Sequence, residues 1–166
     1  ELGRLDPPLA RIPGTAVFLN RGKATAPLSM RTAVDHIRAL HQHVVIVSLE
    51  TEPVPRIMDS ERISVDNLGS SDDGIFHVEA RFGYMERPHV PRALMLVDPD
   101  LCEGGIDLGH ASYFLSKLEL VAGDQPGMAT WRKRLFIATS YITGDAAAYF
   151  GLPQDRTVII GSRLQV

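Results

Sequence analysis

Two short runs of apolar, largely β-branched residues, separated by a helical pattern, constrain the fold of this chain more than any other feature. The first run covers residues 15–19 and the second covers residues 44–49, and the second shows no alternation of polar and apolar residues until its serine. An unbroken apolar run of this kind is typical of a strand that is covered on both faces of a sheet. Residues 44–49 are therefore predicted to form a central strand.

The segment between the two runs has the periodicity of an amphipathic helix. Polar residues such as Arg31 and Asp35 lie on one side, and apolar residues recur at helical spacing on the other: Met30, Ala33, Val34, Ile37 and Leu40. A helix that connects two strands in this way normally makes them parallel and packs on one face of the sheet. We therefore expect a strand, helix, strand unit.

The remaining patterns predict a mixed sheet. Residues 63–68 and 75–82 alternate around a turn rich in Gly, Ser and Asp, which predicts an antiparallel hairpin with one wetter face. Further elements are a short helix at residues 91–97, a loop at 98–109, a strand at 111–121, a long helix at 130–150 that stops at Gly151, and a last strand at 157–160. The predicted fold class is α/β, a single domain with a mixed parallel and antiparallel β-sheet flanked by helices.

The length and hydrophobic content fit one globular domain preceded by a linker. The chain has 166 residues, of which 45% are hydrophobic, and residues 1–14 contain three prolines. We predict a linker at residues 1–14 and a folded domain at residues 15–166. No apolar run approaches the roughly 20 residues that a membrane-spanning helix needs. Because Glu1 begins no signal-like pattern, we expect a soluble part cut from a longer chain.

Charge and cysteine content exclude several classes of partner and site. The net charge is −3, and the only tight basic run is at residues 132–134, so nucleic acid is not an expected partner. Cys102 is the single cysteine, which excludes an intramolecular disulfide and a site of the CxxC type. A lone cysteine fits a reducing, cytoplasmic compartment.

No catalytic or metal-binding constellation stands out. His36, His41 and His43 lie close together in the sequence, but no cysteine or carboxylate stands at ligand spacing beside them. Asp72 and Asp73 belong to a turn cluster, and the chain lacks a nucleophile signature such as GxSxG. We predict no catalytic residues, no metal site and no cofactor, and hence a protein that is not an enzyme.

One loop between the first strand and the first helix could hold an anion. It contains Arg21, Gly22 and Lys23 at the junction where backbone N–H groups can receive a phosphate. One glycine is far from a phosphate-binding fingerprint, so a solvated loop stays the alternative. Arg21 and Lys23 are the candidate contacts for an anion or a nucleotide.

A second candidate segment follows the strand at residues 75–82. The run RFGYMERPHVP at residues 81–91 mixes aromatic, charged and turn residues. It fits an interaction surface, and it equally fits a strand end that packs its aromatic residues on the core before prolines steer the chain into the next helix. The residues of the candidate surface are Arg81, Tyr84, Glu86 and Arg87.

Several segments together resemble the C-terminal domain of the KUP, also called HAK or KT, family of potassium transporters. The similar segments occur in the same order through the chain: RIPGTAVFL at 11–19, HQHVVIVSL at 41–49, RFGYMERPHVP at 81–91, SYFL at 112–115, WRKRLF at 131–136 and YFGLP at 149–153. Two segments depart from the family pattern. Residues 32–38 keep only His36 of a stretch rich in Asn and His, and residues 141–143 replace an Arg-Asn-Ala step.

The resemblance implies a cytoplasmic domain of an integral plasma-membrane protein. The missing membrane part would take up potassium by symport with protons, and would be the partner of this regulatory or assembly domain. Further expected partners are a second copy in a homodimer and a nucleotide ligand. The alternative function is a nucleotide-sensing domain for cyclic di-AMP or an adenine nucleotide, and a small stand-alone α/β enzyme is a third.

Overall fold

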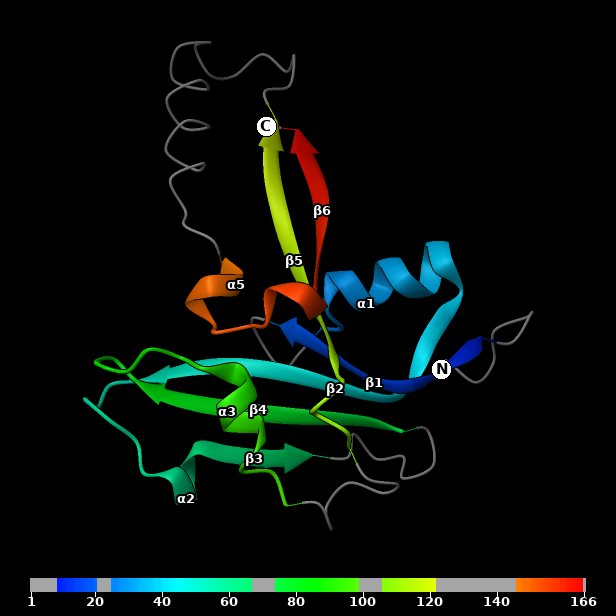
Figure 1. Ribbon diagram of the computed structural model, residues 1–166. Coiled ribbons are helices and arrows are strands. Elements are labelled where there is room, and N and C mark those ends of the chain that lie inside the picture. Colours follow the sequence, from blue (N-terminus) through cyan, green and yellow to red (C-terminus); the bar gives the residue numbers. More distant parts are fainter. Residues whose placement is uncertain (1–8, 21–24, 67–73, 99–105, 122–145, 166) are drawn as a thin grey trace, which may run out of the picture.

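The computed structural model describes residues 9–20, 25–66, 74–98, 106–121 and 146–165. These residues form one six-stranded sheet in the order β3-β4-β2-β1-β5-β6 (Figure 1). Five strands are parallel, and β3 alone runs antiparallel to its neighbour. The strands are β1 Ala10–Asn20, β2 Ala39–Glu52, β3 Ile63–Asp66, β4 Ile75–Gly83, β5 Ser112–Val121 and β6 Thr157–Gln165. The predicted α/β class with a mixed sheet is confirmed.

Short helices cover the two faces of the sheet. One core cluster joins α1 Leu28–Thr32 and the π-helical turn η2 Ala33–Ile37 to one face. The other cluster joins α3 Val90–Leu94 and α5 Ala146–Tyr149 to the opposite face. The remaining short elements are α2 Asp59–Arg62 and the 3₁₀ turn η4 Gln154–Arg156. The sheet is therefore a middle layer between helices, as in other α/β proteins.

Strand β2 is central, as predicted. It pairs with β1 on one side and with β4 on the other, both in parallel, and residues 44–48 are buried. Strand β1 begins at Ala10, inside the segment predicted as a linker, but residues 10–14 are exposed. The register between β1 and β2 slips by one residue at Pro13 and Gly14, where Gly14 has a φ of 109°. Any residue with a side chain would be strained at this φ, so the β-bulge requires glycine.

The helix prediction is correct in position and for the first part of its apolar stripe, since Met30, Ala33 and Val34 pack in the core, but it is wrong at the end of the stripe. The chain is helical from Leu28 to Ile37, but the second half is a π-helical turn that ends at Arg38 with a φ of 58°. A π-turn adds a residue per turn and rotates the following side chains. Ile37 is consequently 63% exposed, although the pattern predicted it on the buried stripe. Leu40 is buried as expected, but it belongs to β2.

The prediction of a wetter face on β4 is also wrong. His77 and Glu79 are 6% and 5% exposed, so both faces of the strand are buried. The polar side chains are satisfied by partners instead of by bulk water. Ser48 Oγ lies 2.9 Å from His77 Nε2, and Arg81 Nε donates to Glu79 Oε1 at 2.9 Å. The polar residues that alternate along β4 are therefore buried residues with hydrogen-bond partners, and they do not form a solvent-exposed face.

The elements after β4 are confirmed where the structure describes them. The helix predicted at 91–97 is α3, the strand at 111–121 is β5, and the strand at 157–160 is β6, which continues to Gln165. Of the long helix predicted at residues 130–150, residues 130–145 lie outside the described residues and α5 is its end. The predicted stop is confirmed, because Gly151 follows α5 with a φ of 64°.

Candidate functional site

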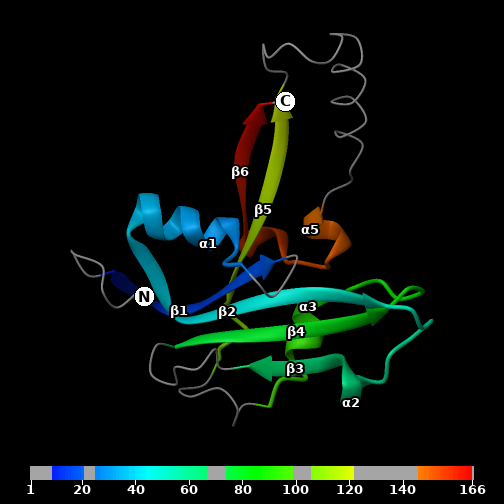
Figure 2. The same cartoon turned by 180° about the vertical axis from the view of Figure 1, so that it is seen from behind.

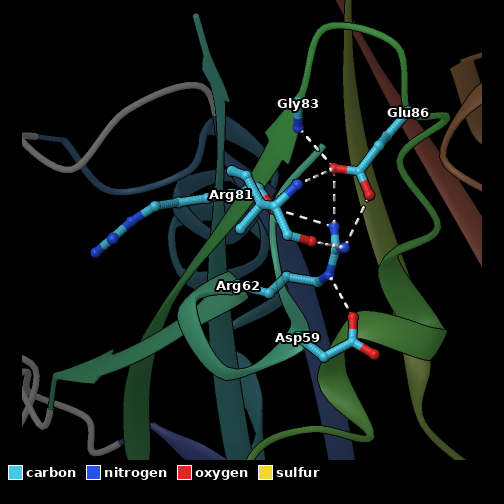
Figure 3. Close-up of polar contacts among 6 residues, drawn as sticks. Asp59, Arg62, Arg81, Gly83 and Glu86 are labelled. Carbon is cyan, nitrogen blue, oxygen red and sulfur yellow. Dashed lines mark hydrogen bonds and ion pairs between the residues drawn. The ribbon is translucent and has the colours of Figure 1, made fainter. Parts of the chain in front are cut away.

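A partly buried ion pair organises the carboxyl end of β4. Arg62 of α2 and Glu86, in the turn after β4, have side chains that are 11% and 18% exposed. Arg62 Nη2 donates to Glu86 Oε1 at 2.8 Å, and its Nη1 lies 3.3 Å from Oε2 (Figure 3). Two parallel donors on one carboxylate form the bidentate geometry that makes arginine pairs strong and directional. The pair fixes α2 against the end of β4.

Backbone groups complete this ion pair. Glu86 Oε2 also accepts hydrogen bonds from the N–H groups of Gly83 at 2.7 Å and Ile57 at 3.2 Å. Arg62 donates in addition to the carbonyl of Ile57 at 2.8 Å and to Asp59 Oδ1 at 3.1 Å (Figure 3). The guanidinium group of Arg62 lies 5.2 Å from the centroid of the Phe82 ring, within the range of a cation–π contact.

The electrostatic effect on Glu86 is large. The hydrogen bonds from Arg62, followed by those from the backbone of Gly83 and Ile57, lower its pKa to about 2, although partial burial acts in the opposite direction. The same pairing, chiefly the side-chain hydrogen bond to Glu86, raises the pKa of Arg62. Both groups are therefore charged at every physiological pH. Because neither group changes its protonation state in this range, the pair acts as a structural anchor and not as a proton donor or acceptor.

A cavity of about 220 Å³ opens beside this anchor. It lies at the carboxyl end of β4, the end at which parallel α/β sheets usually bind their ligands. Apolar, basic and acidic side chains share its wall: Asp59, Arg62, Phe82, Glu86, Arg87, His89, Arg92, Ala93 and Leu96. In the described part of the chain, the guanidinium groups of Arg87 and Arg92 form no hydrogen bond or ion pair.

Exposed apolar side chains stand next to lining residues of the cavity in the sequence. Tyr84 is 62% exposed and Met85 is 67% exposed, and their backbone N–H groups bond to the carbonyls of Val54 and Pro55. Met58, next to Asp59 of the cavity wall, is 71% exposed. We call these side chains together the β4-end surface: Met58, Tyr84, Met85, Arg87, Arg92 and Leu96. Tyr, Met and Arg are the residue types enriched at protein interfaces.

The structure divides the sequence-predicted surface residues between two roles. Tyr84 and Arg87 are exposed on the β4-end surface. Glu86 and Arg81 instead hold the local structure, since Glu86 pairs with Arg62 and Arg81 pairs with Glu79. Phe82 packs in the core, so the run at residues 81–91 both closes the strand and presents a surface. Arg62 and Arg92 had no local sequence signal that would have identified them.

The other sequence candidates do not form a site in the described part of the chain. Arg21 and Lys23 lie outside the described residues, in the segment after the end of β1 at Asn20. His36, His41 and His43 do not converge, and within the described ranges no group of three His, Cys, Asp or Glu residues could hold a metal ion. Burial lowers the pKa of His41. The Ser48 and His77 pair, which the sequence pattern did not indicate, is buried and forms a core hydrogen bond.

Comparison with known proteins identifies the family. Residues 13–166 match the model of the K+ potassium transporter C-terminal domain. A probable potassium transport system protein Kup of Rhodococcus jostii is 65% identical over the whole chain. Similar proteins of Anaeromyxobacter sp. and Bradyrhizobium sp. are 38% and 36% identical over 94% and 96% of the chain. No solved structure matches this chain.

The chain corresponds to only a part of these relatives. It spans 24–25% of their length. None of the helices in the described residues is long and apolar enough to cross a membrane. The family model covers nearly the whole chain, and the ordered segments of the resemblance fall within it except for residues 11 and 12. The chain belongs to the family of C-terminal domains of KUP potassium transporters.

Proposed function

We propose that this chain is the cytoplasmic regulatory and assembly domain of a potassium uptake permease. In this proposal, the membrane part of the same protein carries potassium, coupled to protons, and this domain is not an enzyme. The family assignment and the relatives named as potassium transport proteins support the parent's activity. The observation that carries the regulatory role is the β4-end surface.

The chemistry of the β4-end surface fits a protein partner with acidic and apolar groups. Arg87 and Arg92 are exposed cations without a described partner, although the chain as a whole has a net charge of −3. Exposed methionines adapt to varied apolar surfaces, and the Arg62 to Glu86 pair holds the surrounding backbone in place. We therefore assign this surface to the membrane part of the permease, through acidic residues on its cytoplasmic side.

A charge reversal tests this assignment. We expect Arg87→Glu with Arg92→Glu, in a chimera of the Rhodococcus jostii relative that carries this chain in place of its own segment, to change potassium uptake more than twofold. The reason is that acidic partner residues would then face acidic side chains, which costs binding energy. Uptake of rubidium into cells that lack other potassium uptake systems is the measurement.

The matched control applies the same charge change elsewhere. Arg31→Glu with Arg38→Glu alters two exposed arginines on the α1 side of the molecule and should leave uptake unchanged. Thermal unfolding of the 166-residue chain shows whether each variant is folded. If uptake is equal in both double variants and in the unchanged chimera, the β4-end surface has no role in regulation.

A second function, nucleotide sensing, is favoured by the strand order. Strand β1 lies between β2 and β5, so the connections from this point run in opposite directions along the sheet. Nucleotides commonly bind at such a switch point, beside the carboxyl ends of the strands. The side chain of Ser29 is fully buried there without a hydrogen-bond partner among the described residues, and its N–H bonds to Ser116 of β5. Arg21 and Lys23 follow β1 in the sequence.

Calorimetry separates this second function from the first. If it is correct, cyclic di-AMP, ATP or AMP should bind the 166-residue chain, and Arg21→Ala with Lys23→Ala should weaken binding about tenfold or more through the loss of two charge-assisted contacts. The Arg87 and Arg92 double variant should bind as the unchanged chain does. Absence of heat at millimolar nucleotide would exclude nucleotide sensing and leave the regulatory proposal intact.

A further inference from the structure

The cavity beside the Arg62 to Glu86 pair is large enough for a small ligand. Its volume is about 220 Å³. An apolar cavity of about 150 Å³ in a protein core admits benzene, so the volume here fits one ring that carries a further group. Helix α2, the end of β4 and helix α3 all contribute to its walls. Figures 1 and 2 both show α2 and α3 toward the arrowhead of β4. The sheet therefore holds the walls in place.

The walls of this cavity carry one excess positive charge. They contain three arginines and two carboxylates: Arg62, Arg87, Arg92, Asp59 and Glu86. Both carboxylates accept hydrogen bonds from the guanidinium group of Arg62, Asp59 at 3.1 Å and Glu86 at 2.8 Å (Figure 3). The charges of Arg87 and Arg92 are not compensated in this way, since in the ranges that the structure covers neither guanidinium group has a hydrogen-bond or ion-pair partner. The cavity consequently attracts an anion.

A second part of the wall is apolar. It consists of the ring of Phe82 and the side chains of Ala93 and Leu96. Phe82 and Ala93 are buried, and Leu96 is exposed. An inorganic anion would leave this apolar wall facing water, whereas the apolar part of an organic anion covers it and gains from the burial. Apolar surface with a few convergent polar groups is the usual character of a small-molecule site.

We propose that this cavity binds a small organic carboxylate whose apolar body has about the size of one ring. The guanidinium groups of Arg87 and Arg92 receive the carboxylate, because the planar fork of arginine matches its two oxygens. The ring lies on the apolar part of the wall. The ion pair beside the cavity positions these elements and has its own hydrogen bonds already formed.

Occupation of this site has a consequence for regulation. Arg87 and Arg92 also belong to the β4-end surface, which is assigned above to the membrane part of the permease. A carboxylate bound to them neutralises the charges that this contact uses, so ligand binding and docking exclude each other. This consequence rests on the proposed function, whereas binding of the carboxylate to the 166-residue chain does not.

An NMR titration of the ¹⁵N-labelled 166-residue chain with matched probes tests the site. Phenylacetate has the carboxylate and the ring, phenylacetamide has the ring without the charge, and acetate has the charge without the ring. We expect phenylacetate to shift the backbone signals of residues 82–96 with a dissociation constant of about 1 mM or lower. Phenylacetamide, acetate and inorganic phosphate should each bind about tenfold more weakly or less, because each lacks one half of the recognition.

Two double variants locate the binding site. Arg87→Gln with Arg92→Gln removes both charges and should weaken phenylacetate binding about tenfold or more through the loss of charge-assisted contacts. Arg31→Gln with Arg38→Gln makes the same change at two exposed arginines on the α1 side and should leave binding unchanged. Thermal unfolding shows whether each variant is folded.

Three results would overturn the proposed carboxylate site. They are no phenylacetate binding at millimolar concentration, equal binding of phenylacetate and any of the other three probes, and equal phenylacetate binding in the two double variants. The uptake test of the β4-end surface is made without added carboxylate. Docking to the membrane part can therefore hold where the carboxylate site fails, and the carboxylate site can hold where docking fails.

Discussion

Replacement of Val45 by aspartate is expected to unfold the domain. Val45 is fully buried in the central strand, between Val17 of β1 and Phe76 of β4 in the register. A cavity of about 190 Å³ lies beside it, but the side chains that line it are all apolar and offer the carboxylate no donor. Burial of an unpaired charge costs several kcal/mol, comparable with the roughly 5–15 kcal/mol that stabilises a typical domain.

Thermal and urea unfolding followed by circular dichroism measure this effect. Val54→Asp is the matched control, because Val54 is 41% exposed and its backbone carbonyl, which the substitution keeps, accepts the hydrogen bond from Tyr84. The control should keep an unfolding midpoint close to that of the unchanged chain. A midpoint for Val45→Asp within a few degrees of the unchanged chain would show that this part of β2 is not core.

The central part of the fold could be predicted because its signals are local. The apolar run at residues 44–49 and the helical spacing before it specify a buried strand and a crossover, and β1, α1 and β2 have the predicted order and direction. The prediction failed where an irregular turn of the helix changed which side chains face the core. Nothing in the pattern indicated the π-turn that exposes Ile37 and leaves Arg38 with a positive φ.

The candidate site could be predicted only in part, because its contacts are long-range. Tyr84 and Arg87 follow a strand and were accessible to sequence reasoning. Arg62 lies 24 residues from Glu86, on a helix of four residues that no periodicity indicates. The pairing depends on β3 folding back beside β4, which sets α2 against the end of that strand. Arg92 enters the site only because α3 lines the same cavity.

Loss of the Glu86 charge is expected to destabilise the domain by about 2–3 kcal/mol at neutral pH. This magnitude follows from the change in the pKa of Glu86 from 4.5 to about 2, at about 1.4 kcal/mol for each unit and with some allowance for partial exposure. Glu86→Gln keeps the size of the side chain but leaves the guanidinium of Arg62 with a neutral acceptor. Urea unfolding provides the free energy, and Glu61→Gln, at an exposed glutamate next to Arg62, is the control.

The pH dependence of stability distinguishes loss of this ion pair from a general packing defect. The pKa of Glu86 is lower in the folded domain than in the unfolded chain, so its contribution is fully present above about pH 4.5 and declines as the pH falls toward 2. The difference in unfolding free energy between the unchanged chain and Glu86→Gln should therefore shrink across this window. Glu61→Gln should follow the unchanged chain throughout. A difference that stays constant from pH 7 to pH 2 would mean that the Glu86 carboxylate is not selectively stabilised in the folded state, and Arg62 would then hold the end of β4 by packing on Phe82 alone.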